Sequence, residues 1–266
     1  MIEIMGVVNV TPDSFSDGGE FLDHDAAVAQ GHALISEGAT ILDIGGESTR
    51  PGSHPVGSDE ELRRILPVIE RLADGPALVS VDTYRADVAE RAVAAGAAII
   101  NDVSGGLADP DMFRVAADTG AQIVIGHWRG PSADMYALAD YGRVGREVAT
   151  ELAARVDAAL AAGVATERVV VDPGIGFAKA GEQNWQLLRE LADVTALGHR
   201  VLVGTSRKRF LAGPLGDDAS RERRDHATAV TSVLAQRAGA WGVRVHDVAA
   251  TRDALAILDA WDGGSA

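Results

Sequence analysis

VVVDPGIGFAK, residues 169–179, is the stretch of sequence that decides the fold. Its three consecutive valines are typical of a buried strand, and this strand ends at a carboxylate, Asp172. A proline and two glycines follow and predict a turn. A strand covered on both faces has no favourable place for a charge, so we expect Asp172 to lie at an open end and meet a hydrogen-bond donor. The alternative for an isolated Asp-Pro-Gly is that the carboxylate only caps the following helix or bonds the amides of the turn.

The same pattern recurs along the chain, where an Ala-rich helical segment ends at a glycine and an apolar strand follows. The glycines are Gly38, Gly96, Gly120, Gly163, Gly198 and Gly239. Glycine readily adopts the left-handed conformation that closes a helix. With two further strands, the pattern predicts strands at residues 4–8, 41–44, 78–81, 99–100, 123–125, 169–171, 201–203 and 241–245. The predicted helices are 25–37, 58–72, 85–95, 111–118, 141–162, 183–195, 223–238 and 247–261.

Eight alternations of strand and helix in 266 residues predict an α/β protein, a single (β/α)8 TIM barrel. The expected domain spans residues 1–262, and residues 263–266 are expected to form a frayed tail. A doubly wound parallel sheet is the alternative. Long loops follow the first two strands, at residues 10–19 and 45–57. Loops of this length in a compact domain are usually functional or disordered, and these two are candidates for a cover over the substrate.

Composition restricts the class of partner. The net charge of −15 argues against a nucleic-acid partner, and the absence of cysteine excludes disulfides and thiolate chemistry. No apolar run approaches the length of a membrane span, and the chain starts with a strand pattern, so we expect a soluble, cytoplasmic protein. Only two lysines occur, Lys179 and Lys208, and each follows a predicted strand. Chance explains Lys179 adequately, whereas the neighbours of Lys208 suggest a function.

Polar side chains follow nearly every predicted strand, at the end where a barrel carries its active site. They are Asn9, Asp43, Asp82, Asn101, Asp102, His127, Asp172, Ser206, Arg207, Lys208, Arg244 and His246. Carboxylates, an amide and an ammonium together suit a flat heterocycle that both donates and accepts hydrogen bonds; Asp82, Asn101, Asp172 and Lys208 form this set. An internal ion-pair network that stabilises the rim is the alternative.

A second group of side chains suits an anion. Arg244 and His246 alternate with apolar residues on the last strand, so both point to one face and can bind an oxyanion. Asn9, together with Asp17 in the first loop, could hold Mg²⁺ directly or through water. No spacing indicates zinc, and His127 is given no catalytic role. Neither a Walker loop nor a dinucleotide-binding fingerprint is present.

These motifs resemble those of the dihydropteroate synthases, a family of pterin-binding enzymes in folate synthesis and the target of sulfonamides. The matching stretches are MGVVNVTPDSFSDGG (5–19), DIGGESTRPG (43–52), SVDT (80–83), INDVSGG (100–106), DPGIGFAK (172–179), GTSRKRFL (204–211) and RVHDV (244–248). They occur in order and span residues 5–248. The resemblance implies a transferase that condenses 6-hydroxymethyl-7,8-dihydropterin diphosphate with p-aminobenzoate, using Mg²⁺, to give 7,8-dihydropteroate and diphosphate.

The resemblance also implies roles for individual residues. Pterin would be bound by Asp82, Asn101, Asp172 and Lys208, diphosphate by Asn9, Arg244 and His246, and Mg²⁺ by Asn9 and Asp17. The p-aminobenzoate would be framed by Phe15, Thr49, Arg50, Pro51, Phe177, Ser206 and Arg207. Catalysis would rest on Asp82, Asp172, Lys208, Arg244 and His246. A homodimer is expected as well, for which the apolar residues Val230, Val233, Leu234, Leu255 and Leu258 of the last two helices are candidates, unless they face the barrel.

Two positions depart from the family pattern. Gly126 stands where a methionine commonly lines the pterin pocket, which predicts a softer or roomier wall unless a neighbour fills it. Ala178 stands where glycine is common, a minor change if its backbone is ordinary. Two other functions remain open: a pterin-dependent methyltransferase, and a non-catalytic pterin-binding paralogue. The presence of the SRK motif at 206–208 and of the STRP loop argues against the first, and an intact set of polar residues argues against the second.

Overall fold

A closed barrel of eight parallel strands forms the centre of the protein. The computed structural model describes residues 2–11, 19–47, 56–130 and 135–264. The strands are β1 (Glu3–Asn9), β2 (Ile41–Gly45), β3 (Leu78–Asp82), β4 (Ile99–Asp102), β5 (Gln122–Gly126), β6 (Val169–Asp172), β7 (Arg200–Val203) and β8 (Gly242–Val245). Neighbouring strands follow chain order, and β1 pairs with β8. The predicted barrel is therefore confirmed, and the doubly wound alternative is excluded because its sheet is open.

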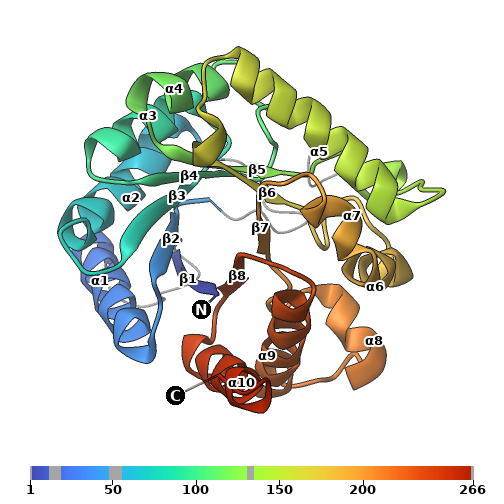
Figure 1. Cartoon of the computed structure of the whole chain (residues 1–266). Coiled ribbons are helices and arrows are strands. Elements are labelled where there is room, and N and C mark those ends of the chain that lie inside the picture. Colours follow the sequence, from blue (N-terminus) through green and yellow to red (C-terminus); the bar gives the residue numbers. More distant parts are fainter. Residues whose placement is uncertain (1, 12–18, 48–55, 131–134, 265–266) are drawn as a thin grey trace.

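Helices form a ring outside the barrel (Figure 1). The α-helices are α1 (Gly19–Glu37), α2 (Ser58–Leu72), α3 (Ala86–Ala94), α4 (Met112–Thr119), α5 (Val144–Ala161), α6 (Gly181–Arg189), α7 (Leu191–Thr195), α8 (Ala212–Leu215), α9 (Arg221–Arg237) and α10 (Val248–Trp261). The 3₁₀ segments are η2 (Met135–Leu138), η3 (Thr166–Arg168) and η4 (Arg209–Leu211). Across the described ranges, none of the helices has both the length and the apolar character needed to cross a bilayer.

The helices confirm the predicted pattern with three differences. All six glycines predicted to end helices have positive φ. However, α1 begins at Gly19 and not at residue 25, the helix predicted at 183–195 is divided into α6 and α7, and the loop after β7 contains η4 and α8. Helices of three to five residues are shorter than the window over which hydrophobic periodicity can be read.

Two separate apolar clusters show which side of each strand faces the barrel interior. One cluster contains helix and strand residues and fills the space between the barrel and the helices. The other is formed by one residue from each of six strands, Met5, Ile41, Ile99, Val124, Val170 and Leu202, and plugs the interior. Because side chains alternate along a strand, residues two positions further along each strand also point inward, toward the carboxyl-terminal mouth.

Candidate active site

The inward positions at the carboxyl-terminal mouth are polar. Counting in steps of two from the apolar plug leads to Asp43 on β2, Asn101 on β4 and Asp172 on β6. On β1, β3 and β8 the outward residues belong to the outer cluster, so the intervening Asn9, Asp82 and Arg244 also face the interior. Strand pleating therefore brings side chains up to 235 positions apart in the sequence to one mouth. This is the convergence that the strand ends predicted.

Arg244 lies between two carboxylates at this mouth. Its Nε donates to Oδ2 of Asp43 at 2.5 Å, and its Nη2 donates to Oδ2 of Asp82 at 2.7 Å. Asn101 Nδ2 donates to the same Asp43 oxygen at 3.0 Å. The side chain of Asp43 is completely buried. Sequence reasoning noted Asp43 as a strand end without giving it a role, and the structure shows that it anchors both a cation and an amide of the site.

Charge and burial oppose each other around Asp82. Burial raises the pKa of the Asp82 carboxyl to about 7; Arg244 acts in the opposite direction, and the carboxylate of Asp43 adds to the rise. For Arg244, burial acts to lower the pKa of the guanidinium, but Asp43 and Asp82 together raise it above its ordinary value. Arg244 is therefore permanently charged, whereas the ionisation of Asp82 changes near neutral pH.

Asp172 and Lys208 form the other side of the mouth. Asp172 Oδ1 accepts from the Gly174 amide at 2.7 Å. Burial raises the pKa of the Asp172 carboxyl, while Lys208 acts to lower it. Burial also lowers the pKa of the Lys208 ammonium to about 8, and Asp172 is the main group that opposes this decrease. The two groups stabilise each other's charged forms in a poorly solvated place.

The turn after β6 shapes the surroundings of Lys208. The Nζ of Lys208 donates to the carbonyl of Ile175 and lies 4.7 Å from the centroid of the Phe177 ring. At Gly176 a Cβ would lie 2.8 Å from Cδ of Lys208, and φ is +84°. At Gly174 a Cβ would lie 2.3 Å from the carbonyl oxygen of His127. The DPGIGF sequence therefore needs glycine at both positions for the turn to close around the lysine.

Ser206 fixes the imidazole of His246. The amide of His246 donates to Ser206 Oγ at 3.1 Å, and Oγ lies 2.8 Å from Nδ1 of the same histidine. Which of the two atoms donates depends on the tautomer of the imidazole, and in either case the contact fixes the orientation of the ring.

Arg207 is turned away from the mouth and paired with α9. Its Nε and Nη2 donate to the two carboxylate oxygens of Asp225 at 2.6 and 2.9 Å. Its backbone has φ of +58°, a left-handed conformation. Contact of Arg207 with p-aminobenzoate stays a prediction. Five other predicted site residues, Phe15, Asp17, Thr49, Arg50 and Pro51, lie outside the described residues.

The two departures from the family pattern have clear structural consequences. At Gly126 a Cβ would lie 2.6 Å from the carbonyl oxygen of Val103. The backbone of the loop after β4 therefore fills the place where a side chain would stand, so the wall is closed and not roomier at this point. Ala178 has φ of +49° and is fully buried. The condition under which this change would be minor, an ordinary backbone, is therefore not met, because this conformation favours glycine.

His127 and Lys179 form a buried pair behind the β6 turn. His127 is 2% exposed, and burial lowers the pKa of its imidazole to about 4. Its Nδ1 lies 3.0 Å from Nζ of Lys179, which is 1% exposed. The sequence alone did not single out Lys179, because a lysine after a strand is usually solvated. Among the described residues, no group of three His, Cys, Asp or Glu side chains is arranged to hold a metal ion.

The fold and the mouth define a barrel enzyme for a flat, polar, anionic ligand, and comparison identifies its class. The profile of the pterin-binding enzyme family matches residues 5–246, so the chain belongs to this family. Dihydropteroate synthase of Mycobacterium leprae is 51% identical over 265 residues, which cover 98% of this chain and 93% of the relative. The Synechocystis dihydropteroate synthase is 45% identical and covers 97% and 89%, respectively.

Solved structures agree with this assignment. Xanthomonas albilineans dihydropteroate synthase with 4-aminobenzoic acid superposes with a TM-score of 0.92 at 45% identity, covering 99% of this chain and 94% of the other. The same enzyme in complex with 7,8-dihydropteroate gives a TM-score of 0.88 at 43% identity, covering 99% and 95%. Within its family, the chain is similar over its whole described barrel to dihydropteroate synthases.

Proposed function

We propose that the protein is a dihydropteroate synthase, which joins 6-hydroxymethyl-7,8-dihydropterin diphosphate to p-aminobenzoate and releases diphosphate. The observation that carries the proposal is the division of the mouth into two halves. Asp172 at the end of β6 and Lys208 after β7 lie on one side, and Arg244 on β8 and His246 directly after it lie on the other. A heterocycle with a doubly phosphorylated tail needs both halves at once.

The pterin half offers acceptors and donors that match a pterin edge. Ring N–H groups and the exocyclic amine of the pterin can donate to the carboxylates of Asp172 and Asp82. Lys208 can donate to a ring nitrogen or carbonyl, and the Asn101 amide can do either. Lys208 already sits near the Phe177 ring, so its ammonium needs no large movement to reach the ligand.

The diphosphate half is preorganised by internal pairing. Arg244 has five N–H groups, and Asp43 and Asp82 engage two of them. The remaining groups can bind an anion without breaking those pairs. Ser206 fixes the orientation of the His246 imidazole directly after β8, where we propose that it contributes to binding the diphosphate.

The amide oxygen of Asn9 at the end of β1 fits Mg²⁺, which prefers a few protein oxygens together with water and substrate phosphates. We propose that Asn9 and Asp17 hold this ion. When bound, Mg²⁺ neutralises charge on the diphosphate. We propose that the described residues Phe177, Ser206 and Arg207 frame p-aminobenzoate, together with Phe15, Thr49, Arg50 and Pro51.

Chemistry would begin with cleavage of the bond between the pterin methylene carbon and the diphosphate oxygen. The electron pair leaves with the oxygen, and Arg244 and His246 stabilise the departing anion. The positive charge left on the pterin is stabilised by Asp82 and Asp172. The amine of p-aminobenzoate then forms the new carbon–nitrogen bond and loses a proton to water. Because the cation is reactive, no strong base is required.

A coupled assay tests the proposed reaction. The purified protein is mixed with the pterin diphosphate, p-aminobenzoate and Mg²⁺, and both dihydropteroate and diphosphate are measured. We expect the two products in equal amounts, with rapid cycling only when p-aminobenzoate and Mg²⁺ are present. Binding of the pterin without product would instead support a non-catalytic paralogue. Methyl transfer from a methylated pterin would support the methyltransferase.

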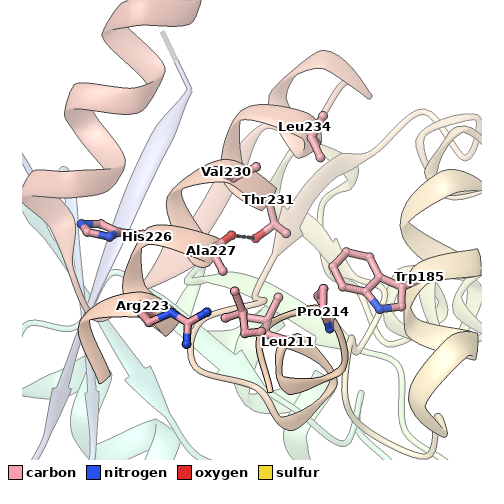
Figure 2. A pocket seen from close by; sticks show the side chains of 10 residues that line it. Trp185, Leu211, Pro214, Arg223, His226, Ala227, Val230, Thr231 and Leu234 are labelled. Carbon is pink, nitrogen blue, oxygen red and sulfur yellow. Dashed lines mark hydrogen bonds between the residues drawn. The ribbon is translucent and has the colours of Figure 1, made fainter. Parts of the chain in front are cut away.

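We also propose a homodimer that associates through α9 and α10, which lie side by side (Figure 1). Val230 and Leu234 on α9 are 60% and 57% exposed, and Trp261 on α10 is 81% exposed. An apolar groove of about 430 Å³ is lined by Val230 and Leu234 of α9 and by Trp185 of α6. Figure 2 shows these side chains around it. Contiguous exposed apolar side chains such as these are typical of surfaces through which proteins associate. Leu255 and Leu258 are buried, which leaves them facing the core.

Sedimentation measurements test the dimer. Val230→Glu combined with Leu234→Glu should convert the protein to a monomer, whereas Leu107→Glu, an exposed residue after β4, should leave the dimer unchanged. A monomeric wild-type protein would contradict the proposal. We expect the enzyme to work in the cytoplasm, because a multiply charged pterin diphosphate does not cross a membrane unaided.

A further inference from the structure

Lys179 is a buried lysine for which the proposed reaction has no direct use. It follows the β6 turn, which we define as residues 172–177. Its Nζ lies 3.0 Å from Nδ1 of His127, 3.0 Å from the carbonyl oxygen of Gly174 and 2.9 Å from that of Phe177. An ammonium has three N–H groups, and here it finds three acceptors. The charged form of Lys179 is therefore fully hydrogen-bonded despite its burial.

The partners of His127 show that this arrangement is built for a charged lysine. His127 Nε2 lies 2.9 Å from Oε2 of Glu151, and Glu151 also accepts from Arg129 Nε at 3.1 Å. Since Nδ1 accepts from the lysine, the imidazole hydrogen is on Nε2 and is donated to Glu151. A neutral amine has only two N–H groups, so one of its three acceptors would face a lone pair.

On its other side, the β6 turn holds groups of the proposed pterin site. The Gly174 amide donates to Asp172 Oδ1 at 2.7 Å, and the Ile175 carbonyl accepts from Lys208. Lys179 binds the carbonyl of Gly174, one residue before Ile175. The two lysines therefore hold neighbouring carbonyls of one turn, Lys208 from the mouth and Lys179 from behind it.

We infer that Lys179 is a positioning residue: its ammonium holds the β6 turn in the form that aims Asp172 at the pterin and fixes Lys208 beside it. This inference rests on the proposed function and concerns the same site. Lys179 does not touch the reacting atoms. It acts through the backbone of the turn, so its removal should affect pterin binding more than diphosphate binding.

Pterin binding should depend on pH through the charge of Lys179. Burial lowers the pKa of the Lys179 ammonium to about 7, and Asp172 is the main group that opposes this decrease. The charge of Lys179 is present below that pH and is lost as the pH rises through it, so the affinity for the pterin should decrease above about pH 7. The titratable and charged groups that face Lys179 are His127, Arg129, Tyr141, Glu151, Asp172 and Lys208.

A matched pair of substitutions on α5 tests this dependence without touching the turn. Glu147 and Glu151 have 36% and 40% exposed side chains, and both pair with Arg129, but only Glu151 contacts His127. Glu151→Gln removes a charge that raises the pKa of Lys179. Asp82 and Lys208 also titrate in this range, but their pKa values are shifted mainly by burial and by charged groups at the mouth, Arg244 and Asp172 respectively. Glu147→Gln therefore serves as the control.

The probe is 6-hydroxymethylpterin, and its dissociation constant is measured by calorimetry at pH 6 and pH 8.5. For Glu151→Gln we expect weaker binding by about threefold to tenfold at the higher pH and little change at the lower one. Glu147→Gln should match wild type at both. Equal behaviour of the two variants would overturn the inference.

The sequence has only two lysines, so a spectrum of protein labelled at lysine Cε contains two side-chain signals. Lys179→Met assigns them. By linkage, a pterin that binds the charged form better must raise the titration midpoint of Lys179. The midpoint should rise when 6-hydroxymethylpterin is added and fall in Glu151→Gln. A midpoint that does not respond to the pterin would contradict the positioning role.

Lys179→Met itself should weaken pterin binding about tenfold and leave diphosphate affinity within about twofold of wild type. If this variant does not fold, the comparison of Glu151→Gln with Glu147→Gln decides, and the two signals are assigned through their response to Glu151→Gln. Failure of wild type to bind the pterin would refute the proposed function. Normal binding by wild type and by every variant at both pH values would refute only the role of Lys179.

Discussion

At the scale of single residues, Ala178 shows where the chain carries local strain. Its φ of +49° places a buried alanine in the left-handed region, which costs roughly 1 kcal/mol relative to glycine. We expect Ala178→Gly to raise the free energy of unfolding by about 1 kcal/mol, which corresponds to about 2 °C in the melting temperature. Calorimetry checks this result. Ala92→Gly in α3 is the control and should be destabilising.

If Ala178→Gly lowered the free energy of unfolding as much as Ala92→Gly, this would contradict a left-handed backbone at Ala178. The comparison also bears on the site, because Ala178 lies directly between Phe177 and Lys179. A small gain in stability with unchanged pterin binding would show that the strain is local and is not needed to shape the β6 turn.

The sequence identified most residues of the mouth but not their pairing. Strand ends located Asp82, Asp172 and Arg244 because alternation and the barrel topology determine which way they point. The pairing of Arg244 with Asp43 depends on a contact between strands two and eight, which are 201 residues apart in sequence. The environment of Lys179 could not be predicted either, since a lysine after a strand gives no sign of burial.

At the scale of elements, the loop after β7 is held by an ion pair with α9. The side chains of Arg207 and Asp225 are 20% and 8% exposed, and two hydrogen bonds join them. Asp225→Asn should lower the free energy of unfolding by about 1–3 kcal/mol. The charged guanidinium of Arg207 would then face a neutral amide in a place where little solvent can compensate for the lost carboxylate. Urea unfolding measures the change.

The control is Asp118→Asn, which removes an exposed pair with Arg114 on α4; their side chains are 65% and 56% exposed. Exposed pairs contribute little, so we expect less than about 0.5 kcal/mol. Equal effects of Asp225→Asn and Asp118→Asn would show that the Arg207 pair does not anchor the loop.

Most elements could be predicted because the repeat combines two strong signals, an apolar strand and a glycine that ends the preceding helix. The helix at 58–72 has the predicted bounds. Prediction was weakest where a segment gives no periodic signal. The added first turns of α1 and the short η4 and α8 are too short to show an apolar face in the sequence.

At the scale of the whole molecule, the mouth should give activity a narrow pH optimum. In the free protein the pKa of Asp82 is raised to about 7 and that of Lys208 is lowered to about 8. If catalysis needs both charged, kcat/KM for the pterin diphosphate should fall as the pH decreases below about 7, where Asp82 becomes protonated. It should also fall above about 7 to 8, where Lys179 and then Lys208 lose their protons.

Rates measured from pH 5.5 to 9.5 should therefore follow a bell-shaped curve. In Glu151→Gln, the alkaline limb should move to lower pH if Lys179 positions the β6 turn. A flat profile over this range would show that the two groups are not both needed in their charged forms.

The proposed activity depends on Lys208, which lies beside Asp172 at the mouth where both the ring and the diphosphate of the substrate would bind. The most direct test is turnover by Lys208→Ala beside the neighbouring exposed control Arg209→Ala. We expect dihydropteroate formation by Lys208→Ala to fall by about a thousandfold or more, with wild-type unfolding behaviour, and by Arg209→Ala to stay within about threefold of wild type. Turnover by folded Lys208→Ala within about tenfold of wild type would contradict the account.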